Sequence, residues 1–122
     1  MLAAEDYHLD WVANAQATML SYWDAVRDYD SIQRWLTVAP YCDPVKATNH
    51  FNQCNGRNQA RALISLGQYE LAQPLLEELT TVAREFGLKT DLNRNHIALA
   101  YLYWQLDERE QALDHMKTAL EL

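Results

Sequence analysis

The chain has 122 residues, of which 49% are hydrophobic and 22% charged, and its formal net charge is −7. This length suits a single domain, and 3 glycines and 3 prolines are too few for the many turns of a β-sandwich, so the composition favours helices. Because nucleic acids and anionic membranes attract basic surfaces, we expect this acidic chain to contact neither of them directly.

Helical periodicity and end signals predict six helices, at about 5–25, 29–38, 47–66, 69–86, 91–106 and 108–120. Pro40 and Pro44 separate the second helix from the third, because proline lacks the amide proton that a helix needs. Gly87 is expected to end the fourth helix. Thr90 and Asp91 are expected to cap the start of the fifth helix with side-chain oxygens.

The predicted helices form three pairs that are related by a step of 40 residues. Gly67 lies between two helices and gives the backbone the freedom that a tight turn needs, and the step leads from it to Arg27 and Asp107. Positions that flank the turns also match at this spacing, and we call each set of equivalent positions a column. One column is Leu20, Ala60 and Ala100, and another is Trp23, Leu63 and Tyr103.

The string Gly67-x-Tyr69-x-x-Ala72, with Ala60 before it, resembles the helix-turn-helix unit of tetratricopeptide repeats, whose usual length is about 34 residues. We therefore predict an all-α, tetratricopeptide-like right-handed α-solenoid. Its three two-helix repeats lie at about 5–40, 45–87 and 88–122 and form a single domain.

In such a stack the first helix of each repeat lines the concave inner face. The polar and aromatic positions of this face are Asn14, Thr18, Ser21, Asp24, Arg57, Asn58, Arg61, Ser65, Arg94, Tyr101, Trp104 and Gln105. Planar hydrogen-bonding groups beside flat aromatic rings suit a neutral, hydroxyl-rich ligand such as a sugar. A solvated helix surface and a groove for an extended peptide are the alternatives. The residues predicted to bind ligand are Arg57, Asn58, Arg61, Arg94, Tyr101 and Trp104.

The sequence lacks the motifs of an enzyme, since it contains no nucleophile elbow, P-loop or dinucleotide-binding glycines. We therefore interpret the chain as a non-enzyme without a metal site. Cys42 and Cys54 do not form a C-x-x-C motif, and we interpret them as reduced thiols. No signal peptide or membrane-spanning run is evident, which favours a cytoplasmic protein. Four histidines are expected to stand isolated on helices, namely His8, His50, His96 and His115.

Several strings resemble the MalT family of ATP-dependent transcriptional activators of the maltose regulon, and the resemblance runs from about residue 7 to residue 120. They are "YHLDWVANA" (7–15), "NHF" (49–51), "RNQARALISLGQYELA" (57–72), "LLEEL" (75–79), "DLNRN" (91–95) and "LYWQ" (102–105). The resemblance implies a segment of the family's superhelical sensor domain. In the full-length family member, ATP and maltotriose together drive self-association and the activation of transcription.

The resemblance implies that this segment carries neither the ATP-binding nor the DNA-binding part, so we expect no cofactor within it. The implied partners are maltotriose or a related oligosaccharide and other copies of the protein. The alternative is a generic protein–protein interaction scaffold of the tetratricopeptide type. We also expect the isolated segment to self-associate, because the end units of a solenoid expose apolar faces.

Overall fold

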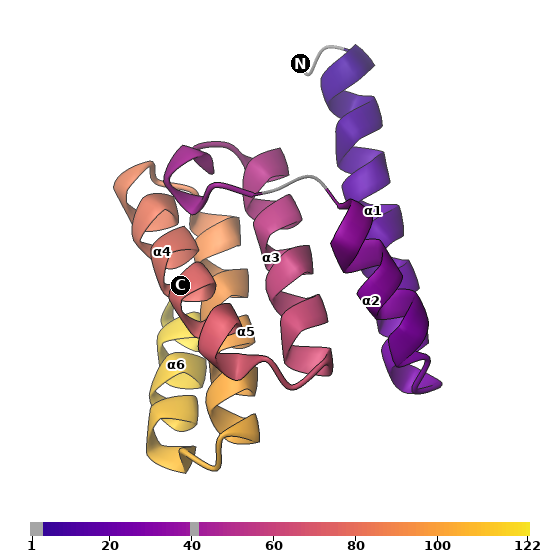
Figure 1. Cartoon of the computed structure of the whole chain (residues 1–122). Helices are drawn as coiled ribbons and strands as arrows, with labels where there is room; N and C mark the ends of the chain where they lie inside the picture. Colours follow the sequence, from indigo (N-terminus) through magenta and orange to yellow (C-terminus); the bar gives the residue numbers. More distant parts are fainter. Residues whose placement is uncertain (1–3, 40–41) are drawn as a thin grey trace.

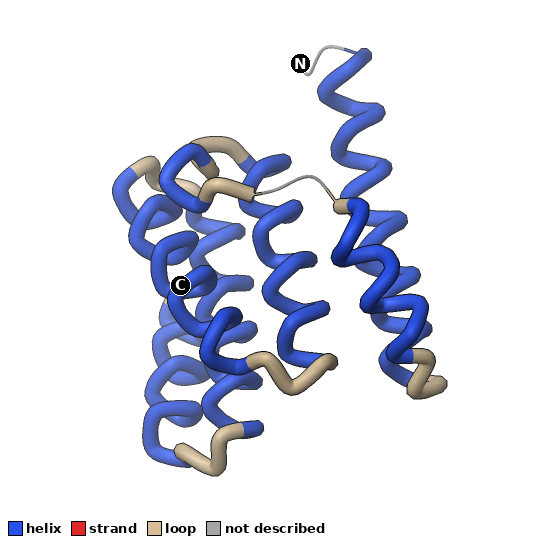
Figure 2. Tube along the Cα trace, in the orientation of Figure 1, coloured by secondary structure: helices blue, strands red, loops and turns tan. Residues whose placement is uncertain are grey.

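The computed structural model describes the backbone of residues 4–39 and 42–122, and the side chains of these ranges from Trp11 onward. Within these ranges the chain is entirely helical, without strands (Figure 2), which confirms the all-α prediction. The elements are α1 (Ala4–Ala25), α2 (Tyr29–Val38), the short 3₁₀ helix η1 (Pro44–Lys46), α3 (His50–Ser65), α4 (Tyr69–Glu85), α5 (Lys89–Gln105) and α6 (Arg109–Glu121).

Four of the connections between helices use the same three-residue turn. In each turn one residue has a left-handed backbone, with φ of 60° at Arg27, 75° at Gly67, 67° at Gly87 and 59° at Asp107. The next amide then donates to a carbonyl five residues earlier, as from Gln68 N to Leu63 O at 2.9 Å. This Schellman arrangement satisfies carbonyl groups at a helix end. The step of 40 residues from Arg27 through Gly67 to Asp107 therefore marks the turns within the three helix pairs.

The connection from α2 to α3 is longer and contains η1. Asp43 caps η1 by accepting a hydrogen bond from Val45 N at 3.2 Å, and Asn49 caps α3 by accepting one from Asn52 N at 2.9 Å. The Asn49 cap explains why α3 begins at His50 and not at residue 47 as predicted. Pro44 lies at the first position of η1, and Pro40 lies outside the described residues.

The start of α5 differs from the prediction. The helix begins at Lys89, and Leu88 occupies the N-cap position without a side-chain cap. Thr90 and Asp91 therefore lie inside the first turn, and the prediction that they cap the helix was wrong. Asp91 is buried, with 2% of its surface exposed, because it bonds to residues of α3.

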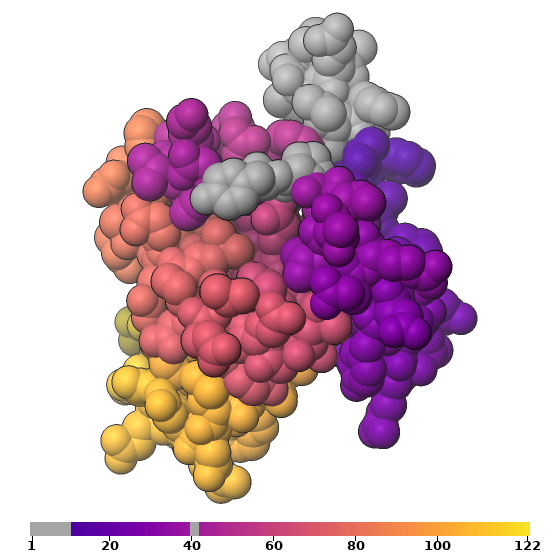
Figure 3. Space-filling model, viewed as in Figure 1, coloured from indigo at the N-terminus to yellow at the C-terminus, as the bar shows by residue number. Residues whose placement is uncertain are grey.

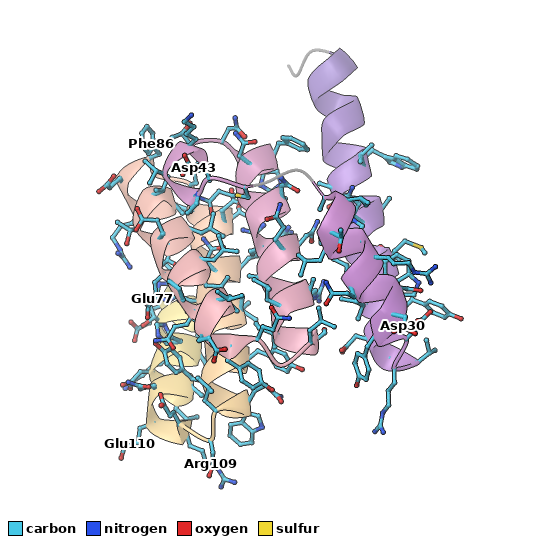
Figure 4. All side chains as sticks on the ribbon, viewed as in Figure 1. Asp30, Asp43, Glu77, Phe86, Arg109 and Glu110 are labelled. Atoms are coloured by element: carbon cyan, nitrogen blue, oxygen red, sulfur yellow. The ribbon has the colours of Figure 1, made fainter. Side chains whose placement is uncertain are left out.

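Helices α3–α6, which we call the body, pack around one apolar core, and the α1–α2 pair, which we call the hairpin, lies along the side of α3 (Figures 1 and 3). Figure 4 shows Asp43 and Phe86 at one end of the molecule and Asp30, Arg109 and Glu110 toward the other, as expected for antiparallel pairs. The buried residues of the body core are Cys42, Ala47, Ala60, Ile64, Ala72, Leu76, Leu79, Leu99, Leu102, Tyr103 and Ala112.

The hairpin packs through a smaller apolar cluster of Leu20, Ile32 and Ala62, where Ala62 belongs to α3. Four partly buried side chains pack against this cluster, namely Trp23, Trp35, Leu36 and Leu66. The predicted column of small and apolar residues is buried in all three repeats, at Leu20, Ala60 and Ala100.

Gly56 allows α3 and α4 to approach closely. A Cβ atom at this position would lie 2.8 Å from both terminal carbons of Leu79 and 3.0 Å from the sulfur of Cys42. Any larger residue would therefore force the buried side chain of Leu79 to move. Among the described residues, no helix combines the length and the apolar character that are needed to cross a lipid bilayer.

Candidate functional site: a groove between the first helices of the repeats

A groove of about 590 Å³ lies between α1, α3 and α5, the first helices of the three repeats. This volume falls in the range of roughly 300–1,000 Å³ that is typical of small-molecule sites. The lining residues recur every three or four positions, so they lie on one face of each helix. They are Ala13, Asn14, Ala17, Ser21 and Asp24 from α1; Cys54, Arg57, Asn58, Arg61, Ile64 and Ser65 from α3; and Arg94, Ile97, Ala98 and Tyr101 from α5.

Five of the six residues predicted to bind ligand line this groove, namely Arg57, Asn58, Arg61, Arg94 and Tyr101. Trp104 does not line the groove: it is 54% exposed, and the guanidinium of Arg109 lies 5.2 Å from the centre of its ring. Of the other positions assigned to the inner face, Asn14, Ser21, Asp24 and Ser65 line the groove, whereas Thr18 and Gln105 do not.

Three charged side chains of the groove are available to a ligand, namely Arg61, Arg94 and Asp24. Each is exposed, and within the described part of the chain none of these side chains makes a hydrogen bond or an ion pair. Tyr101 is half exposed beside them. Burial raises the pKa of the Tyr101 hydroxyl, and the negative charge of Asp24 raises it further. The hydroxyl therefore stays protonated at neutral pH and is able to donate a hydrogen bond.

Arg57 and Asn58, in contrast, hold the walls of the groove together. Asn58 is buried and donates from Nδ2 to the carbonyl of Ala13 at 3.1 Å, which ties α3 to α1. Arg57 donates from Nη2 to Asp91 Oδ1 at 3.1 Å and from Nη1 to Asn95 Oδ1 at 2.9 Å. Arg57 of α3 thus forms an ion pair with Asp91 of α5.

A buried chain of side-chain hydrogen bonds extends from Arg57 through the interface between α3 and α5. Asn95 donates to Gln53 Oε1 at 2.9 Å, and Gln53 donates to the carbonyls of Ala47 at 2.8 Å and Leu79 at 3.1 Å. Gln53 and Asn95 are both fully buried. Because a buried polar group costs free energy unless it is paired, this complete pairing fixes the register of α5 on α3.

His50 is not isolated, contrary to the prediction. Its Nδ1 lies 2.8 Å from Asp91 Oδ1 and 3.0 Å from Oδ2, and the sulfur of Cys54 lies 3.5 Å from its Nε2. Arg57 Nη2 also lies 3.3 Å from that sulfur. An imidazole, a thiol and a carboxylate therefore meet at the end of the hydrogen-bond chain that adjoins the groove.

The prediction of isolated histidines is also wrong for His96 and His115, whose Nδ1 atoms lie 3.0 Å apart. The His115 ring stacks on Tyr103 with 5.3 Å between the ring centres. Burial lowers the pKa of both imidazoles, and the charge of His115 lowers the pKa of His96 further. The side chain of His8, the remaining histidine, lies outside the described residues.

The model of one protein family, the MalT-like TPR region, matches residues 1–122, where TPR denotes the tetratricopeptide repeat. The chain belongs to this family. Over all of its residues it is 42% identical to the HTH-type transcriptional regulator MalT of Klebsiella pneumoniae strain 342. It spans 13% of the length of that curated relative. The resemblance seen in the sequence is therefore confirmed, and the groove is a feature of a MalT-like TPR region.

Sequence reasoning missed four residues of this MalT-like TPR region, namely His50, Gln53, Asp91 and Asn95. One local signal was present, because His50 and Cys54 are four residues apart and so share a face of α3. The contact with Asp91 has no local signal, since it joins residues 41 apart in the sequence.

Proposed function

We propose that this segment binds maltotriose or a related oligosaccharide in the groove between α1, α3 and α5, as the ligand-sensing part of a MalT-type transcriptional regulator. The observation that carries the proposal is the groove itself. It brings together the first helices of all three repeats, and it presents two arginines, Arg61 and Arg94, that have no partner among the described residues. In this proposal the chain binds a ligand and does not catalyse a reaction.

The chemistry of the free groups suits a sugar. A guanidinium donates two parallel hydrogen bonds, which match a pair of neighbouring sugar hydroxyls, and Asp24 is able to accept hydrogen bonds from others. The ring of Tyr101 offers an apolar face against which the C–H side of a pyranose is able to pack. Arg57 and Asn58 then act by positioning the walls, since their donors already bond to Asp91, Asn95 and Ala13.

The test is a calorimetric titration of maltotriose into the intact sensor domain that contains this segment. Arg61→Ala and Arg94→Ala are each expected to weaken binding about tenfold or more, because a hydrogen bond from a charged donor is worth about 1.5–3 kcal/mol. Arg34→Ala is the matched control, because Arg34 donates hydrogen bonds to Asp30 and Ser31 of its own helix and does not line the groove. Absence of maltotriose binding to the intact domain, or equal affinities in all variants, would contradict the proposal.

A second candidate function is the recognition of an acidic peptide by a tetratricopeptide-type scaffold. The observation that favours it is charge, since three arginines and one aspartate line the groove of a chain whose net charge is −7. Peptide binding would weaken steeply with added salt, whereas binding of a neutral sugar would not. Titrations at two salt concentrations, with maltotriose and with an acidic peptide, therefore distinguish the two functions.

We also propose that the segment contributes to self-association. Helix α6 exposes Leu113, Met116 and Leu120, which are 64%, 42% and 83% exposed and lie along one side of the helix. We expect the mass measured by light scattering to rise with protein concentration. A constant monomer mass up to high concentration would contradict this expectation. The resemblance assigns ATP binding and DNA binding to other parts of a MalT-type regulator.

A further inference from the structure

We propose that His50, Cys54 and Asp91 form a binding site for a divalent transition metal ion of the Zn²⁺ class. One potential ligand atom from each residue, an imidazole nitrogen, a sulfur and a carboxylate oxygen, lies within 4.8 Å of the other two. His50 and Cys54 are one helical turn apart on α3, and Asp91 comes from the first turn of α5. The proposal does not depend on the identity of the ligand in the groove.

Two of the three separations between the ligand atoms are close to those around a tetrahedral ion, and the third is within 4.8 Å. Bond lengths of about 2.0–2.3 Å to nitrogen, oxygen and sulfur place the ligands of tetrahedral zinc roughly 3.4–3.6 Å apart. Here His50 Nδ1 lies 3.8 Å from the sulfur of Cys54 and 3.0 Å from Asp91 Oδ2. The sulfur also lies 3.5 Å from Nε2, so it faces the side of the imidazole and not the lone pair of Nδ1. Metal binding therefore requires a rotation of the half-exposed His50 ring that turns the Nδ1 lone pair toward the sulfur.

The pairing of Asp91 leaves one of its oxygens for the ion. Arg57 donates to Oδ1 at 3.1 Å, so Oδ2, beside His50 Nδ1, is the oxygen that would bind metal. The same guanidinium nitrogen lies 3.3 Å from the sulfur of Cys54. Arg57 would then act as an outer hydrogen-bond donor that holds both the carboxylate and the thiolate in place. Its positive charge makes the site weaker than one without an arginine.

The types of ligand select the class of metal. A thiolate together with an imidazole favours zinc and its neighbours in the first transition series over magnesium or calcium, which prefer oxygen ligands. Binding releases one proton, that of the Cys54 thiol, while the imidazole proton moves from Nδ1 to Nε2. Water supplies the fourth ligand.

An ion is able to reach the site from solvent and from the groove. The side chain of His50 is 41% exposed, and Cys54 and Arg57 line the groove. Asp91, which is 3% exposed in its side chain, lies behind them. The site is therefore open on the side that faces the groove and held rigidly on the side that faces the core.

The test uses Co²⁺ as a spectroscopic probe that is added to the untagged, reduced chain. We expect a near-ultraviolet charge-transfer band from thiolate to cobalt and the intense visible bands of tetrahedral cobalt. Both should saturate at one ion per chain and disappear when Zn²⁺ is added. Cys54→Ser should abolish the charge-transfer band, and His50→Gln should weaken cobalt binding at least tenfold.

The matched control is Cys42→Ser, because Cys42 is as buried as Cys54, but its sulfur contacts the carbonyl of Asn52 and belongs to no cluster of potential metal ligands among the described residues. This variant should keep the bands of the original chain, and circular dichroism establishes that each variant is folded. A folded original chain without a charge-transfer band at saturating Co²⁺ would overturn the proposal. A band that survives Cys54→Ser, or one that is lost with Cys42→Ser, would also overturn it.

Discussion

The hairpin and the body contain the same two-helix unit, but different forces hold each of them in place. In the body, α3–α6 enclose a continuous apolar core, and a buried chain of hydrogen bonds from Gln53 to Asp91 joins α3 to α5. The hairpin packs on α3 through a small apolar cluster, and the described residues add the buried hydrogen bond from Asn58 to Ala13. The comparison teaches that the apolar core and the buried polar groups shared between repeats, and not the two-helix unit itself, decide how firmly one repeat is held on the next.

The largest expected loss of stability comes from truncating a buried leucine in the core of the body. Leu76 and Ile32 are both fully buried, the first in the body and the second in the hairpin. Leu76→Ala is expected to lower the free energy of unfolding by about 2–5 kcal/mol, because it leaves a cavity in a packed core. Ile32→Ala removes a similar volume, but we expect its effect to be confined to the hairpin.

Urea denaturation measures the loss of stability, and hydrogen exchange of peptide fragments locates it. Ile32→Ala should speed exchange in α1 and α2 and leave α4–α6 protected. Leu71→Ala is the control for the leucine substitution, since Leu71 is 56% exposed and its loss should change stability by less than about 0.5 kcal/mol. Equal acceleration of exchange in the hairpin and the body by Ile32→Ala would show that the two unfold as one unit.

We expect acid to lower the free energy of unfolding by a smaller amount. This loss should arise in the body, where His96 of α5 meets His115 of α6. Folding lowers the pKa of His96 and His115 below the ordinary value of 6.5. As the pH falls through about 6.5, these two histidines become protonated in the unfolded chain but stay neutral in the folded chain. The free energy of unfolding therefore decreases. Stability should be constant from pH 8 to 7 and should decline from there toward pH 5.

Urea denaturation midpoints measured at several pH values in this range show how stability changes with pH. The double variant His96→Gln, His115→Gln should flatten the decline between pH 7 and pH 5. A decline of the same size in the double variant would assign the acid sensitivity to other groups.

The smallest expected change in stability comes from substitutions in the turns between helices. Arg27 in the hairpin and Asp107 in the body have left-handed backbones, which suit glycine better than residues with a Cβ atom. Asp107→Gly is expected to raise the free energy of unfolding by about 0.5–1 kcal/mol. Arg27→Gly should slow hydrogen exchange in α1 and α2 alone. Gly67→Ala should destabilise by a similar amount through its backbone only, since the added Cβ would meet no atom within 4 Å.

The repeats and their turns were predictable from the sequence, because a turn residue and its flanking apolar columns are local and periodic signals. The same step of 40 residues indicated which polar side chains share the inner face, since equivalent positions of stacked first helices lie side by side. Trp104 was wrongly assigned to the groove's lining. It lies one residue before the end of α5, exposed beside the Arg109 guanidinium, although its counterpart in the first repeat, Asp24, does line the groove.

The buried contacts of Asp91 could not be predicted in the same way. Its position near the expected helix start suggested a cap, because a cap needs only local chemistry. Its partners, Arg57 and His50, lie 34 and 41 residues earlier in the chain. Whether these side chains meet depends on the register and the angle at which α5 packs against α3. The sequence therefore indicated which helices meet, but not which of their polar groups pair.

The groove has one wall on the hairpin and the others on the body, and this arrangement has a thermodynamic consequence. A molecule that touches both sides would add its own free energy to the attachment of α1 to α3. By reciprocity, anything that loosens this attachment would lower the affinity for that molecule by the same factor. Substitutions remote from the groove, on the far side of the hairpin, are thereby able to tune recognition without contacting the bound molecule.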